Sequence, residues 1–220
     1  MPPAKKPSIP GGRVVRPGKT DPSAAFERAR RALLAADPRL AEVIKRTGRD
    51  RPDFTPRDPL AALVRALVSQ QLSTRAADTI HKRVLQLVPS LSAENILKVS
   101  PADLRAAGLS GQKVAYLRDL AERIADGRLD LSSLRHKSDE EVIEAIVAVK
   151  GFGRWSAQMF LMFCLHRPDV LPTGDLGIVK GMQGVLGLKR RPAVRTMERA
   201  AKAWAPYRTI ACWYVWRSLE

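Results

Sequence analysis

Capping side chains paired with proline or an acidic residue recur along this 220-residue chain and limit it to short helices. An Asp or Ser side chain accepts the first backbone N–H groups of a helix, and proline suits the first turn because its missing N–H has no partner there. The signals are Asp21-Pro22, Asp37-Pro38, Asp58-Pro59, Ser73, Ser100-Pro101 and Ser138-Asp139. Their spacing predicts about ten helices. No segment shows the alternation of apolar and polar residues that is typical of a strand.

Apolar residues between these signals follow a helical period, which predicts one buried face per helix. With 45% hydrophobic residues, the chain can bury a sizeable core. We therefore expect an all-α protein, a two-lobed helical bundle with a helix-hairpin-helix motif and a cleft between the lobes. Three stripes carry the pattern: Leu60, Leu63, Val64, Leu67 and Val68; Leu117, Leu120, Ala121 and Ile124; Val142, Ile143, Ile146 and Val147.

Composition shifts divide the chain. A polar, proline-broken connection at residues 49–59 is a suitable place for the chain to cross between lobes. The expected parts are a flexible basic tail at 1–20, N-terminal helices at 21–58 that join the lobe of the C-terminal helices, a helical bundle at 59–134, and the hairpin, an aspartate segment and the C-terminal helices at 135–220.

The chain is strongly basic. Lys and Arg number 38 against 22 Asp and Glu, a formal charge of +16. Five of the basic residues lie in residues 1–20, so the remainder still carries +11. Such an excess indicates a polyanionic partner, first of all nucleic acid.

Two cysteines, Cys164 and Cys212, are too few for a disulfide framework, a zinc site or an iron–sulfur cluster built from cysteines. The sequence has no apolar run of the ~18 residues that a membrane span requires, and its start lacks a secretion signal. We expect a cytoplasmic protein, nucleoid-associated in a bacterium, with no membrane partner.

Two glycines one residue apart, Gly151 and Gly153, separate two helical segments. They permit a tight turn whose N–H groups, with the positive end of the next helix, suit a phosphodiester oxygen. A plain connection between helices is the alternative. The backbone carbonyls of Val147, Val149 and Phe152 are candidates for binding Na⁺ or K⁺, and no other cofactor is expected. The predicted phosphate-binding residues are Lys150, Gly151, Phe152, Gly153, Arg154 and Ser156.

Asp175 lies just before a later helical segment. An N-cap role is the simplest interpretation. A capping carboxylate is compatible with chemistry, because an ionised carboxylate in an electropositive groove can stabilise a cationic sugar-like transition state or orient a water molecule.

Trp155 and Trp216 are candidates for a pocket that stacks on a nucleobase, although tryptophans at helical spacing usually belong to the core. Gln70 and Gln71 end an apolar helix, where they are either solvated or available to hydrogen-bond an extruded base.

The segment Lys150–Ala157 with Asp175 downstream resembles the helix-hairpin-helix DNA glycosylase superfamily, and more closely its 3-methyladenine DNA glycosylase II family. The likeness extends from Pro59 to Leu219. Related segments are Leu67–Ser73, Gly108–Lys113, Leu171–Asp175 and Trp216.

The resemblance implies a monomeric enzyme that flips a damaged nucleotide out of double-stranded DNA, the first step of base excision repair. Asp175 would stabilise the oxocarbenium-like sugar or help water attack C1′. Methylated purines such as 3-methyladenine and 7-methylguanine already carry positive charge and leave without protonation. Trp155 stands where lyase relatives have a catalytic lysine, which implies a monofunctional glycosylase. The alternatives are a non-catalytic DNA-binding module and a glycosylase for mismatched or oxidised bases.

The sequence departs from the family pattern at two places. Some relatives insert a bulky apolar residue into the DNA from the turn that corresponds to Gly108–Lys113, but here the aligned residue is Gly111, so Leu109 or Gln112 would have to fill the gap. Met159 stands where an aromatic residue lines the pocket in relatives, which indicates a roomier site.

Overall fold

The computed structural model describes residues 22–48, 51–53 and 55–220, so the predicted tail at 1–20 lies outside the described residues. The described residues form twelve α-helices and two short 3₁₀ helices, without a strand, which confirms the all-α prediction. The elements are α1 (Pro22–Ala36), α2 (Pro38–Thr47), α3 (Pro59–Ser69), α4 (Thr74–Leu87), α5 (Ala93–Lys98), α6 (Pro101–Ala106), α7 (Gly111–Ala125), η1 (Leu134–His136), α8 (Asp139–Val147), α9 (Arg154–Phe163), α10 (Leu176–Val185), α11 (Val194–Ala201), η2 (Lys202–Trp204) and α12 (Arg208–Arg217).

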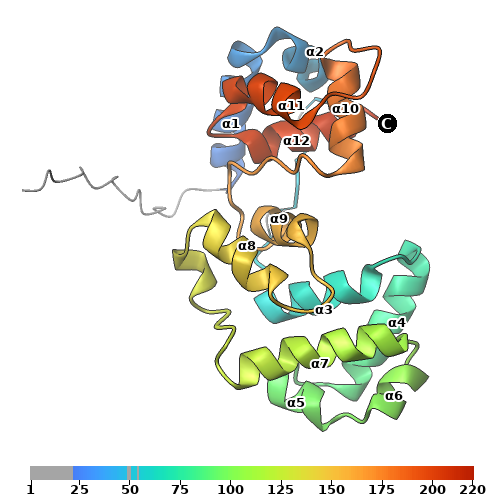
Figure 1. Ribbon diagram of the computed structural model, residues 1–220. Helices are drawn as coiled ribbons and strands as arrows, with labels where there is room; N and C mark the ends of the chain where they lie inside the picture. The colour runs from blue at the N-terminus through green and yellow to red at the C-terminus, as the bar shows by residue number, and fades with distance from the viewer. Residues whose placement is uncertain (1–21, 49–50, 54) are drawn as a thin grey trace, which may run out of the picture.

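The helices form two groups that are joined through α8 and α9 (Figure 1). In one group, α12 packs against α1, α2 and α10. In the other, α7 packs against α3, α5 and α6, and α4 contacts α3. The pair α8 and α9 lies between the groups, with α9 touching α3. Helices α1 and α2 therefore pack with α12, the last of the described helices.

Five of the predicted caps hold the helix starts. The side chains of Asp37, Asp58, Ser73, Ser100 and Ser138 each accept a backbone N–H in the first turn of α2, α3, α4, α6 and α8. Asp21 lies outside the described residues. The sequence analysis missed two further serine caps, Ser92 at α5 and Ser110 at α7.

The predicted apolar stripes form the buried faces, with one exception. All five stripe residues of α3 are buried, as are Leu117, Leu120 and Ala121 of α7, while Ile124 is half-buried. On α8 the prediction is wrong for Val147, whose side chain is 43% exposed. Val147 is the last residue of α8, and its side chain faces solvent although the hairpin returns to the core at Val149 and Phe152. Within the described ranges, none of the helices has the length and apolar character of a bilayer-crossing segment.

Helices α10 and α12 approach closely because a glycine faces the contact. A Cβ atom on Gly181 would lie 2.5 Å from the backbone oxygen of Val215, so only glycine allows this spacing. The close packing of α12 on α10 brings the end of the chain to the N-terminus of α10, where Asp175 lies.

Candidate active site

Asp175 caps α10, as predicted, and its carboxylate also accepts hydrogen bonds from two indoles. Asp175 Oδ1 accepts the backbone N–H of Ile178 at 2.8 Å and Nε1–H of Trp216 at 2.9 Å. Its other oxygen, Oδ2, accepts Nε1–H of Trp155 at 2.7 Å. An ionised carboxylate offers about four acceptor positions. Three are used here, which leaves one for a substrate or a water molecule.

Gly177 makes room for this arrangement. A Cβ atom at this position would lie 2.8 Å from Cδ1 of Trp216 and 3.1 Å from Oδ1 of Asp175. Any side chain would therefore push the indole away from the carboxylate. The sequence analysis missed Gly177, although a glycine two residues after a candidate carboxylate is a visible signal for close packing.

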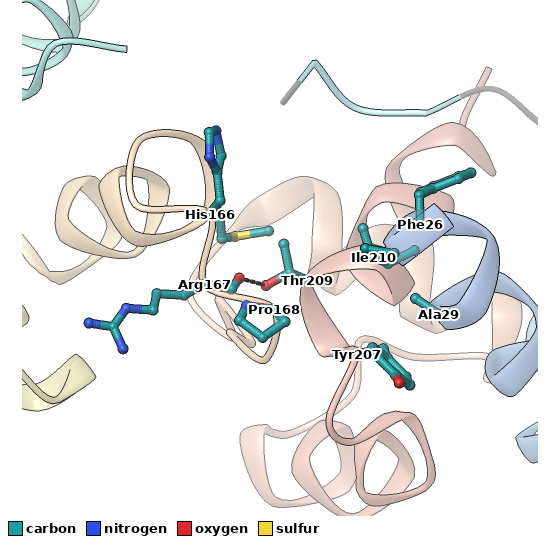
Figure 2. Close-up of a pocket in the computed structure, with 10 residues that line it drawn as sticks. Phe26, Ala29, His166, Arg167, Pro168, Tyr207, Thr209 and Ile210 are labelled. Atoms are coloured by element: carbon teal, nitrogen blue, oxygen red, sulfur yellow. Dashed lines mark hydrogen bonds between the residues drawn. The ribbon is translucent and has the colours of Figure 1, made fainter. Parts of the chain in front are cut away.

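The connection that leads to Asp175 is fastened to the start of α12 (Figure 2). Thr209 donates its hydroxyl to the carbonyl of Arg167 at 2.6 Å and accepts the N–H of Val170 at 3.1 Å. The Arg208 guanidinium forms a bidentate pair with Asp169, which holds the pKa of that carboxyl below its usual range in spite of burial. These bonds fix the entry to α10. Next to them, a cavity of about 230 Å³ lies between α1 and α12, and it contains none of the predicted site residues.

A larger cavity of about 590 Å³ lies between α3 and α9, within the size range of small-molecule sites. Three of the four predicted base-pocket residues line it, namely Trp155, Met159 and Gln70. Trp216 differs from the prediction. It does not line this cavity but packs on Phe163, which does, with ring centroids 6.0 Å apart. The cavity and the Asp175 carboxylate thus meet at Trp155, whose side chain is 50% exposed.

The hairpin turn is held rigidly by the helix α7. Gly151 has φ +84°, and a Cβ atom there would lie 2.1 Å from the Tyr116 ring, so the turn requires glycine. The buried carboxylate of Asp119 accepts the N–H of Lys150 at 2.9 Å and pairs with Arg123. The N–H of Phe152 bonds to the carbonyl of Val149 within the turn.

Two of the predicted outward-facing amides, those of Lys150 and Phe152, are therefore used inside the protein. The N-terminus of α9 is different, because its cap residue Gly153 provides no side-chain acceptor. The first N–H groups of a helix have no partner within that helix. An anion suits this end of α9, at Arg154 and Ser156.

The Arg154 side chain points elsewhere. Its guanidinium forms two hydrogen bonds with the Glu140 carboxylate, at 3.1 and 2.6 Å, and this pairing lowers the pKa of Glu140. Lys150 keeps an exposed ammonium group, 3.9 Å from Asp119.

In the turn Gly108–Lys113, which was expected to fill the gap in DNA, the Leu109 side chain cannot reach DNA because it is buried in the core. Gly111 is the exposed first residue of α7 and carries no side chain. Gln112 is exposed, but its amide donates to the Tyr116 hydroxyl at 2.5 Å, beneath the hairpin.

A different turn, between α3 and α4, presents residues at the cavity. Gln71 is exposed, lines the cavity and adopts φ +57°, which is uncommon for a residue other than glycine. Leu72 beside it is 38% exposed. Gln70 donates its amide to the carbonyl of Gly151 at 2.8 Å, which connects this turn to the hairpin. Leu176, next to Asp175, is a further exposed apolar residue that the sequence analysis missed.

Cys164 and Cys212 are both buried and unpaired. Burial raises the pKa of the Cys164 thiol to about 11 and also raises that of Cys212. Neither thiol is activated as a nucleophile.

Comparison with known proteins shows the family of this chain. The family model described as HhH-GPD superfamily base excision DNA repair protein matches residues 64–206. DNA-3-methyladenine glycosylase 1 of Schizosaccharomyces pombe is 32% identical over 192 residues, which cover 84% of each protein.

Solved structures agree. A DNA-3-methyladenine glycosidase from Bacillus halodurans is similar with a TM-score of 0.79 and 39% identity, over 86% of this chain and 88% of that one. The 3-methyladenine DNA glycosylase Mag1 of S. pombe, solved in complex with abasic DNA, is similar with a TM-score of 0.71 and 31% identity, over 86% and 95% of the two chains. This chain belongs to the HhH-GPD superfamily of base excision DNA repair proteins.

Proposed function

We propose that the protein is a monofunctional DNA glycosylase that excises alkylated bases of the 3-methyladenine and 7-methylguanine type from double-stranded DNA, as a monomer. The observation that carries this proposal is the Asp175 carboxylate, held by Trp155 and Trp216 at the edge of a cavity large enough for a base. The similar proteins named DNA-3-methyladenine glycosylase support the class of substrate. We expect the enzyme to act wherever the DNA is, in the cytoplasm and at the nucleoid if the host is a bacterium.

In this reaction, Asp175 stabilises positive charge that develops on the sugar as the N-glycosidic bond breaks. Its one remaining acceptor position faces the sugar or the attacking water. The two indole N–H groups fix the plane of the carboxylate, so little reorganisation is needed when the charge develops. The exposed face of Trp155 borders the cavity and can attract a cationic base by about 0.5–2 kcal/mol. A positively charged methylpurine needs no general acid, which fits a site with one carboxylate.

The hairpin positions the DNA. A backbone phosphate suits the N-terminus of α9, where the cap residue Gly153 offers no competing acceptor. We further propose that Na⁺ or K⁺ binds at the carbonyls of Val147, Val149 and Phe152. The C-terminus of α8 supports this, because it ends at Val147 with no basic residue in its last turn and its carbonyls carry the negative end of the helix dipole. Exchange of K⁺ for a bulky organic cation at constant ionic strength should weaken DNA binding. An unchanged affinity for DNA would exclude the proposed cation site.

Gln71 is the residue best placed to fill the gap that a flipped nucleotide leaves. It is exposed, lies at the mouth of the cavity and belongs to a turn fixed to the hairpin. Filling the gap from this side keeps the base from returning to the stack.

The substitution Asp175→Asn tests the proposed chemistry. Asparagine caps a helix as well as aspartate does, and its one oxygen can still accept from Ile178 and Trp216, so the fold and DNA affinity should be retained although the bond from Trp155 is lost. Loss of the negative charge should slow base release roughly 10³-fold. The measurement is single-turnover release of 3-methyladenine from methylated duplex DNA, with released bases identified by chromatography.

Asp58→Asn is the matched control, since Asp58 is an N-cap aspartate at the start of α3. It should leave the rate of base release unchanged. Binding without release by the wild-type protein would indicate the non-catalytic module, and release of oxidised or mismatched bases in place of methylpurines would indicate the third class.

A further inference from the structure

The turn at Gln71 is held by a residue that lies 42 positions away in the sequence. Lys113, on α7, donates from Nζ to the carbonyl of Val68 at 2.8 Å and to the carbonyl of Gln70 at 2.7 Å. These carbonyls lie at the C-terminal end of α3, which has no basic residue in its own last turn. A cation suits this end of a helix, and ionised donors make the stronger hydrogen bonds.

The carbonyl of Gln70 belongs to the peptide unit that leads directly into Gln71. Gln71 adopts φ +57°, a left-handed conformation that costs about 1–2 kcal/mol for a residue with a side chain. Such a conformation persists when the surrounding structure determines it. Lys113 supplies this constraint, because its bond to Gln70 fixes the orientation of that peptide.

Lys113 is set among groups that also hold the hairpin. Gln112 bonds to Tyr116, whose ring covers Gly151, and Asp119 holds the N–H of Lys150. Gln70 connects the turn between α3 and α4 to the hairpin, because its side-chain amide donates to the carbonyl of Gly151. Partial burial lowers the pKa of Lys113, consistent with an internal rather than a solvated ammonium group.

We propose that Lys113 is a positioning residue for base extrusion: its ammonium group holds the turn at Gln71 in the shape that enters the DNA and keeps this turn in register with the phosphate-binding hairpin. Lys113 itself does not touch the substrate. The inference rests on the proposed function only in that Gln71 fills the gap in the duplex.

A double-mutant cycle tests this role. Lys113→Met should slow single-turnover base release about 10- to 50-fold, the loss expected for two charge-assisted bonds. Gln71→Ala should slow it by a similar factor. If Lys113 acts through Gln71, the double variant should be within about threefold of Gln71→Ala alone, because the two losses are not independent.

Arg118→Met is the matched control. Arg118 is also on α7 and donates to a carbonyl at the end of a helix, that of Val99 after α5. Like Lys113→Met, the substitution Arg118→Met removes one positive charge and a hydrogen bond to a helix-end carbonyl, but it does so away from the turns proposed to face DNA. Its effect should be within about twofold of wild type and should multiply with that of Gln71→Ala. The same multiplication for Lys113→Met would overturn the inference.

A second readout needs no catalysis. A duplex with a stable abasic analogue and a neighbouring 2-aminopurine reports how the gap is filled. Wild-type protein should change the fluorescence, and Lys113→Met should bind but lose more than half of the change. If the wild type changes the fluorescence and releases no base, the proposed chemistry is wrong while the positioning role stands. If Lys113→Met gives the same fluorescence change as the wild type, the positioning role is excluded. Lys113→Gln replaces it in this test if the Met variant does not fold.

Discussion

Two turns of this protein share a backbone design and differ in the residue that precedes the following helix. Gly108-Leu109-Ser110 leads into α7, and Gly151-Phe152-Gly153 leads into α9. Both begin with a left-handed glycine, at φ +110° and +84°. In both, the next side chain is apolar and buried, with Leu109 at 4% and Phe152 at 6% exposure.

The third residue decides what each helix start can bind. Ser110 accepts the N–H of Lys113 at 3.2 Å, so α7 meets its own need for an acceptor. Gly153 has no side chain, so the start of α9 has no side-chain acceptor, which suits the proposed phosphate. The glycine turn is therefore used twice, and the two turns differ in whether a side chain caps the helix that follows; the uncapped turn before α9 is the proposed anion site.

The largest expected effect on the free energy of unfolding comes from replacing the first glycine of each turn by alanine. Gly151→Ala should destabilise the protein by about 3 kcal/mol, because it adds left-handed strain to a clash with the Tyr116 ring. Gly108→Ala should cost about 2 kcal/mol, since its Cβ would lie 2.9 Å from the flexible side chain of Ile80. Urea unfolding measures both values.

Gly127→Ala is the control for strain alone. Gly127 has φ +77° and no atom within 4 Å of its Cβ position. If Gly151→Ala were no more destabilising than Gly127→Ala, the close packing of the hairpin on Tyr116 would contribute nothing.

Much of the fold follows from local signals. The caps at Asp37, Asp58, Ser73, Ser100 and Ser138 and the stripes of α3, α7 and α8 depend on residues three or four positions apart, where helix geometry determines the neighbours. The hairpin and the cap at Asp175 are local in the same way. The end of the α8 stripe was mispredicted at Val147 because periodicity does not show which side chains of a last helical turn face solvent.

The remaining features of the site depend on contacts between distant segments. The bond from Trp216 to Asp175 joins residues 41 positions apart, and that from Gln70 to Gly151 joins residues 81 apart. No periodicity encodes these separations. The same limit explains Leu109, which looks available in a turn until the core packed around it is known.

The second prediction gives the turn before α9 the capping serine of its counterpart before α7. Gly153→Ser introduces a hydroxyl acceptor at a position with extended backbone, φ −112° and ψ 177°, and open space around its Cβ. The helix should gain a few tenths of a kcal/mol. Because the new hydroxyl occupies an N–H that a phosphate would use, DNA affinity should fall about 3- to 10-fold. Fluorescence anisotropy at fixed salt measures the affinity. An unchanged affinity would exclude phosphate binding at the start of α9.

The smallest effect is expected for the reverse change, Ser110→Gly. It removes the α7 cap, which should cost a few tenths of a kcal/mol in urea unfolding. DNA affinity should stay within about twofold, since one neutral hydrogen bond inside the protein is exchanged for one to water. A gain in affinity would be the informative surprise. It would mean that the start of α7 also faces a phosphate once its cap is removed, so that the two turns would form a pair along the DNA rather than a binding turn and its structural copy.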